Sequence, residues 1–118
     1  MKKVLIIDDE IKLREALVEL FSFIGYQIIE AQDGIDGLDK VSIHIPDLIL
    51  CDVMMPKLDG YGFLKKHMAS SNASIPVLLL TAKTEESDEL IGRNLGAKDY
   101  IKKPFSFQEL KRIVEKYI

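Results

Sequence analysis

The sequence predicts an α/β fold: a five-fold repeat of strand and helix that builds a doubly wound parallel sheet of five strands. Two observations predict it. Short, continuous apolar runs recur along the chain, and such runs are typical of parallel strands buried on both faces. The segments between them carry apolar residues at spacings of three and four, as helices do that pack one face on a sheet. Alternation of this kind favours right-handed crossovers, with helices on both faces of the sheet.

Five segments have the composition of strands. Residues 4–7, 48–51 and 77–80 are continuous apolar runs, which we expect to be the central strands. Residues 27–30 and 98–101 are less apolar and are predicted to be the edge strands. Because each segment is separated from the next by a helical pattern, the connections predict parallel pairing throughout.

Five helices are predicted after these strands, with apolar stripes within residues 13–24, 38–45, 63–68, 90–95 and 110–117. In the fourth helix we expect Leu90, Ile91 and Leu95 to form the apolar stripe, and Gly96 to end the helix. Ser106 precedes Glu109 by three residues, which predicts a capping box at the start of the last helix.

Composition limits the class of function. The 118 residues suffice for one domain, and a net charge of −3 argues against a domain that binds the phosphate backbone of nucleic acid. The single cysteine, Cys51, excludes an internal disulfide and is expected to pack in the core. No apolar stretch is long enough to span a bilayer. We therefore expect a cytoplasmic domain over residues 1–118, with neither a nucleic acid nor a membrane as partner.

Polar side chains follow the predicted strands: Asp8, Asp9 and Glu10 after the first, Asp52 after the third, Thr81 after the fourth, and Lys103 after the fifth. The carboxyl ends of parallel strands meet at one edge of a sheet, where such folds bind their ligands. We therefore expect carboxylates, a hydroxyl and an amine to converge in one site.

The chemistry of these groups indicates phosphoryl transfer. Clustered carboxylates repel one another, and a divalent cation relieves that repulsion; carboxylate and water ligands suit Mg²⁺. Lysine binds phosphate well, and an aspartate can act as a nucleophile that forms an aspartyl-phosphate. The residues therefore predict Mg²⁺-dependent transfer of a phosphoryl group onto one of these carboxylates.

Four motifs, in this order and spacing, resemble the receiver domain of two-component response regulators: VLIIDDE (4–10), PDLILCDVMMPKLDG (46–60), LLLTAK (78–83) and GAKDYIKKPF (96–105). The resemblance covers essentially the whole chain, and it extends to the receivers of winged-helix DNA-binding regulators and to stand-alone receivers. It implies a flavodoxin-like strand order 2-1-3-4-5 and a signalling switch that catalyses only its own phosphorylation and dephosphorylation. The chain ends soon after the fifth predicted helix, so we expect no effector domain within it.

The resemblance also implies roles for the matching site residues. Asp52 would accept the phosphoryl group from a phosphohistidine on a sensor histidine kinase or a histidine phosphotransfer protein. Asp8, Asp9, Asp52 and the main-chain carbonyl of Met54 would hold Mg²⁺. Lys103 would contact the phosphoryl group.

The same resemblance implies a conformational switch. Thr81 would move toward the phosphoryl group and Tyr100 would turn inward behind it, changing the surface of the fourth helix, fifth strand and fifth helix. The bond before Pro104 would be cis. In similar regulators that surface forms a homodimer through charged pairs. Here Glu89 stands where a basic residue is expected and Ile113 where an arginine is expected, so a homodimer on phosphorylation stays an open alternative.

Two other classes of function remain as alternatives. A small nucleotide- or flavin-binding module would need a glycine-rich loop after the first strand, where this chain has acids. An aspartyl-phosphate hydrolase would usually carry an acid two residues after its nucleophile, where this chain has Met54. His44 and His67 lack metal-ligand spacing and are expected at the surface or the edge of the core.

Overall fold

Strands and helices alternate along the computed structural model, which describes residues 1–83 and 85–118. The elements are β1 (Lys3–Ile7), α1 (Ile11–Phe23), β2 (Gln27–Ala31), α2 (Gly34–His44), β3 (Leu48–Asp52), α3 (Gly60–Met68), β4 (Val77–Thr81), α4 (Glu86–Leu95), β5 (Asp99–Lys102) and α5 (Phe107–Tyr117). Each predicted strand and helix is present, with bounds close to those expected. Within the described residues, no helix has the length and apolar character needed to cross a membrane.

The five strands form one parallel sheet in the order β2-β1-β3-β4-β5, which confirms the predicted topology. β1 lies beside β3 with Ile7 opposite Cys51, so the residues that follow these two strands emerge side by side. Thr81, the last residue of β4, lies opposite Lys102 of β5. The register therefore brings the ends of β1, β3, β4 and β5 to one edge of the sheet.

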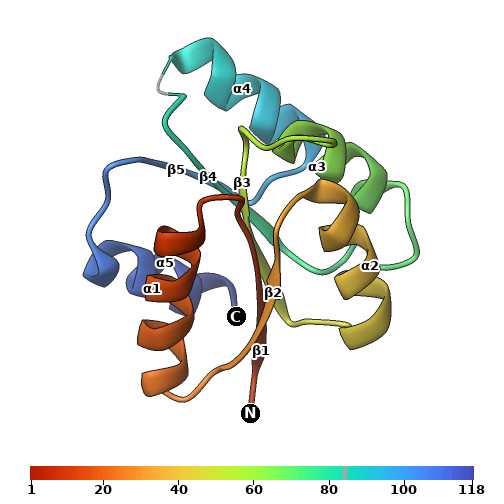
Figure 1. The fold of residues 1–118 in the computed structure, drawn as a ribbon. Helices are drawn as coiled ribbons and strands as arrows, with labels where there is room; N and C mark the ends of the chain where they lie inside the picture. The colour runs from red at the N-terminus through yellow and green to blue at the C-terminus, as the bar shows by residue number, and fades with distance from the viewer. Residues whose placement is uncertain (84) are drawn as a thin grey trace.

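Helices cover both faces of the sheet: α1 and α5 lie on one face, and α2, α3 and α4 on the other (Figure 1). Successive residues of β1 point to opposite faces, as expected for a pleated strand. Leu5 and Ile7 pack with α2 and α3, whereas Val4 and Ile6 pack with α1 and α5. A strand buried on both faces needs apolar residues along most of its length, which explains the continuous runs in the sequence.

Local sequence signals set several helix ends. Asp59 caps α3 by accepting a hydrogen bond from the main-chain nitrogen of Gly62 at 2.8 Å. Ser106 caps α5 in the same way, accepting from the main-chain nitrogen of Glu109 at 3.1 Å. Gly96 ends α4 with a φ of 116°, in the left-handed region that favours glycine. These caps satisfy main-chain groups that a helix leaves unpaired at its ends.

The predicted apolar stripe of α4 is confirmed at Leu95, which packs against the core, but is wrong at its other two residues. Leu90 and Ile91 are 55% and 48% exposed, and the buried residue of this helix is Gly92. A Cβ added at Gly92 would lie 2.9 Å from Leu79 and 3.1 Å from Tyr100. The helix therefore approaches the sheet through its smallest residue, and the close approach turns the two larger side chains toward solvent.

His67 was expected at the surface or at the edge of the core, and the structure excludes the surface, because its side chain is buried. Its Nε2 lies 3.0 Å from the carbonyl oxygen of Ile75, and its ring stacks on that of Phe63. Cys51 is buried in the core, as predicted.

Candidate functional site

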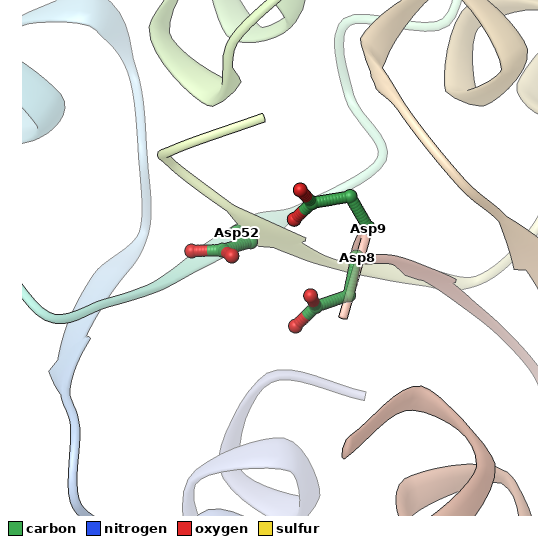
Figure 2. Close-up of side chains that lie close together, drawn as sticks. All are labelled: Asp8, Asp9 and Asp52. Atoms are coloured by element: carbon green, nitrogen blue, oxygen red, sulfur yellow. The ribbon is translucent and has the colours of Figure 1, made fainter. Parts of the chain in front are cut away.

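Three aspartates meet where β1 and β3 end (Figure 2). Asp8 and Asp9 follow β1, Asp52 is the last residue of β3, and each offers one carboxylate oxygen within 4.8 Å of the others. Asp8 and Asp52 are buried, whereas Asp9 is exposed to solvent. The arrangement follows from the parallel pairing of two adjacent strands, and it places a concentrated negative charge at the edge of the sheet.

Lys103 reaches this cluster from the segment after β5. Its Nζ lies 3.4 Å from Oδ2 of Asp52 and 3.6 Å from Oδ2 of Asp8, with Glu10 Oε2 at 3.9 Å. Its main-chain nitrogen donates a hydrogen bond to the carbonyl oxygen of Thr81 at 2.8 Å, which ties the segment after β5 to the end of β4. The peptide bond that follows, to Pro104, is cis.

Burial perturbs the two inner carboxylates. It raises the pKa of Asp8 from 3.8 to about 6, against the hydrogen bond from the Glu10 main-chain nitrogen and the charge of Lys103, which both lower it. Burial also raises the pKa of Asp52, again opposed mainly by the charge of Lys103. One ammonium group therefore does not compensate for the desolvation of these two carboxylates.

The negative charge and the unsatisfied oxygen of this site could be balanced by a cation. Oδ2 of Asp8 is buried and has no hydrogen-bond partner among residues 1–83 and 85–118. An orphaned carboxylate oxygen beside two further carboxylates is the ligand set that a hard, oxygen-binding cation prefers. Met54, expected to add its carbonyl, lines with Asp9 a surface hollow of about 430 Å³. Its role as a ligand stays a prediction.

The expected switch pair lies next to this site. Thr81 is the last residue of β4, and Tyr100 lies in β5. Thr81 is buried, and its Oγ1 accepts a hydrogen bond from the main-chain nitrogen of Lys83 at 3.0 Å. Tyr100 was expected to turn inward only as Thr81 moves, but its ring is already inward, at 5% exposed. Its hydroxyl donates to the carbonyl oxygen of Lys83 at 3.1 Å and lies 3.2 Å from that of Tyr61.

Two residues that contact the site were not identified from the sequence. Arg14 of α1 donates a hydrogen bond from Nη1 to the main-chain oxygen of Asp8 at 2.6 Å. Tyr61 of α3 places its hydroxyl between that of Tyr100 and the carbonyl oxygen of Asp88, to which it donates at 3.0 Å. No local pattern marks either one, since an arginine or a tyrosine within a helix is ordinary.

Comparisons with known proteins agree with this geometry. The family model of the response regulator receiver domain matches residues 4–115. The chain is 44% identical over 113 residues to the alkaline phosphatase synthesis transcriptional regulatory protein PhoP of Bacillus subtilis, with 92% of this chain and 45% of that protein covered. It is 40% identical over 108 residues to the response regulator MprA of a Mycobacterium species, covering 92% of this chain and 46% of that protein. The chain thus spans about half the length of these relatives.

Solved structures show the same fold along the whole chain. Chemotaxis protein CheY4 of Vibrio cholerae is 32% identical with a TM-score of 0.93, covering 100% of this chain and 99% of that one. The receiver domain of the Francisella response regulator 1452 is 33% identical with a TM-score of 0.92, covering 99% of this chain and 96% of that one.

Proposed function

The chain belongs to the receiver domain family of two-component response regulators, and from that premise we propose that Asp52 is its phosphoacceptor. Receiver domains are signalling modules rather than turnover enzymes. The observation that carries the assignment is the position of Lys103, whose Nζ is 3.4 Å from the Asp52 carboxylate, beside two further acids that fit a cation. No other acid of the site is the last residue of a strand and this close to an ammonium group.

The proposed reaction moves a phosphoryl group from nitrogen to oxygen. A carboxylate oxygen of Asp52 attacks phosphorus, the P–N bond to a phosphohistidine breaks, and the imidazole leaves and takes up a proton. Lys103 contacts the phosphoryl oxygens with its ammonium group, which its present distance from Asp52 allows. Thr81 donates its hydroxyl hydrogen to another phosphoryl oxygen. The proposed donors are a sensor histidine kinase and a histidine phosphotransfer protein in the cytoplasm.

Asp8, Asp9, Asp52 and the Met54 carbonyl would hold Mg²⁺ in this scheme. When bound, the ion would neutralise the negative charge that gathers on the carboxylates and the phosphoryl oxygens. The raised pKa of Asp8 supports this proposal, as does its Oδ2, which within the described part of the chain accepts no hydrogen bond and has only the Lys103 ammonium group near it at 3.6 Å. With few protein ligands and retained waters, the site should bind Mg²⁺ weakly in the absence of a phosphoryl group.

We propose that phosphorylation changes the surface formed by α4, β5 and α5, and that partners recognise the phosphorylated state there. A hydrogen bond from Thr81 to the phosphoryl group would favour one of two arrangements of Lys83, whose carbonyl oxygen accepts a hydrogen bond from the Tyr100 hydroxyl. Glu89 pairs within the chain, with Arg93 at 2.9 Å and Lys102 at 3.4 Å. A homodimer through charged pairs would have to exchange these contacts, so it remains the secondary proposal for this surface.

The test is labelling with a small phosphodonor. We expect the wild-type protein, incubated with acetyl phosphate and Mg²⁺, to gain one hydroxylamine-labile phosphoryl group by intact-mass analysis. Asp52→Asn should gain none, and EDTA should prevent the gain in the wild type. Asp39→Asn, which changes an exposed aspartate of α2, is the matched control and should label normally. A labile phosphoryl group on Asp52→Asn would refute the assignment.

A further inference from the structure

Arg14 ties the acidic loop after β1 to the neighbouring strand. It lies in the first turn of α1, and its side chain is only 16% exposed. Nη1 donates a hydrogen bond to the main-chain oxygen of Asp8 at 2.6 Å, while Nε donates to Oε1 of Glu30, in β2, at 3.1 Å. One guanidinium group therefore binds the end of β1 and the edge strand at the same time.

The contact with the Asp8 carbonyl bears on the position of Asp9. That carbonyl belongs to the peptide that joins Asp8 to Asp9, and because a peptide is planar, holding its oxygen also orients the bond that leads to the Asp9 Cα. The Asp8 carboxylate has a separate support, since Oδ1 accepts a hydrogen bond from the Glu10 main-chain nitrogen at 2.8 Å. Asp9 is exposed, so packing does little to hold its carboxylate.

We propose that Arg14 is a positioning residue for the cation site, an inference that rests on the proposed function of the three aspartates. Arg14 acts through the Asp8–Asp9 peptide and touches neither the cation nor the phosphoryl group. Arginine suits the task because its planar group offers several rigidly spaced donors, whereas lysine offers a single nitrogen that cannot meet both partners in this way. Groups that orient metal ligands typically change metal affinity by about 10- to 100-fold when they are replaced.

A purely electrostatic role for Arg14 predicts the opposite result. A positive charge near a cation site repels the cation, so removing that charge would tighten binding. Arg14→Lys retains the charge and most of the aliphatic stem but loses the two-point contact, and Arg14→Gln loses both charge and contact. Positioning therefore predicts weaker Mg²⁺ binding in both variants, whereas electrostatics alone predicts unchanged binding in the first and tighter binding in the second.

The experiment is calorimetric titration of the metal-free protein with MgCl₂, at a temperature at which circular dichroism shows every variant folded. We expect Arg14→Lys and Arg14→Gln to raise the Kd for Mg²⁺ at least about tenfold. Phosphorylation by acetyl phosphate should be slow at low Mg²⁺ and recover at saturating Mg²⁺. Glu30→Gln is the matched control: it removes the negative charge of the exposed partner but leaves the Asp8 contact, so its Kd should change less than about fivefold.

Three outcomes separate the possibilities. Binding of Mg²⁺ by Arg14→Lys as tightly as by the wild type, or tighter binding by Arg14→Gln, would overturn the positioning role and leave the proposed function intact. A wild-type protein that neither binds Mg²⁺ nor takes up a phosphoryl group would remove both proposals. Should Arg14→Gln fail to fold, Arg14→Lys, which retains charge and stem, decides the question alone.

Discussion

The buried carboxylate of Asp8 should destabilise the metal-free domain at neutral pH. Its pKa is raised from 3.8 to about 6, mainly by burial, and a rise of this size corresponds to about 3 kcal/mol. A folded-state pKa above the unfolded value means that the folded protein binds more protons between these two values. The free energy of unfolding therefore falls as pH rises through this window, and the full loss is present above about pH 6.

Replacing the carboxylate by an amide of the same shape should recover part of this free energy. Asp8→Asn can still accept the hydrogen bond from the Glu10 main-chain nitrogen, but it loses the favourable 3.6 Å contact between Oδ2 and the Lys103 ammonium group. We therefore expect a gain of about 1–3 kcal/mol in the free energy of unfolding at pH 7.5. The gain should shrink as the pH falls below about 6 and vanish below 3.8, where the wild-type carboxyl is protonated in both states.

The assay is urea unfolding followed by far-ultraviolet circular dichroism, in EDTA, at pH 7.5, 6 and 4.5. Asp39→Asn removes an exposed carboxylate and should stay within about 0.5 kcal/mol of the wild type at each pH. Added Mg²⁺ should stabilise the wild type more than Asp8→Asn and so reduce the difference between their free energies of unfolding. The reasoning fails if Asp8→Asn is no more stable than the wild type at pH 7.5, or if its advantage grows as the pH falls.

Three further predictions follow from the site. Asp9→Ala should remain folded but lose labelling by acetyl phosphate by at least about tenfold, because a cation ligand is gone; normal labelling would contradict the cation site. Beryllofluoride, a phosphoryl mimic, should shift the amide NMR resonances of Thr81 and Tyr100, and unmoved resonances would count against the switch. The combined change Met54→Asn and Lys83→Glu should shorten the phosphoryl lifetime measured by radiolabel decay, since methionine and a lysine ammonium cannot activate water; equal or slower decay would discard this idea.

The sheet was predictable because its residues report directly on burial. A strand covered on both faces is apolar along most of its length, so the runs at 4–7, 48–51 and 77–80 marked the three central strands to within one residue. The helix caps were also local signals, as at Ser106. The face that α4 turns toward the sheet was not marked by such a local signal. Gly92 determines that face because it fits closely against Leu79. Periodicity detects apolar side chains, but it does not detect a close approach through a residue without a side chain.

The strand-end groups of the site could be predicted for a related reason. Parallel pairing brings the ends of strands together, so acids and a lysine that follow strands must meet whatever the details of packing. Contacts made by side chains to distant main chain could not be predicted in this way. The Tyr61 and Tyr100 hydroxyls are 39 residues apart in sequence, and Arg14 binds a carbonyl oxygen, a group that every residue has.

The alternatives suggested by the sequence are not supported. The match to the receiver family over residues 4–115 separates the chain from nucleotide- and flavin-binding modules and from aspartyl-phosphate hydrolases.

The central claim, that Asp52 carries the phosphoryl group, can be tested by locating the modified carboxyl directly. An acyl phosphate is reduced by borohydride to an alcohol, which converts a phosphorylated aspartate into homoserine. The wild-type protein would be phosphorylated with acetyl phosphate and Mg²⁺, reduced, digested and sequenced by tandem mass spectrometry. The account predicts homoserine at position 52 and unchanged aspartate at Asp8 and Asp9. Homoserine at either of those positions, with Asp52 intact, would contradict it.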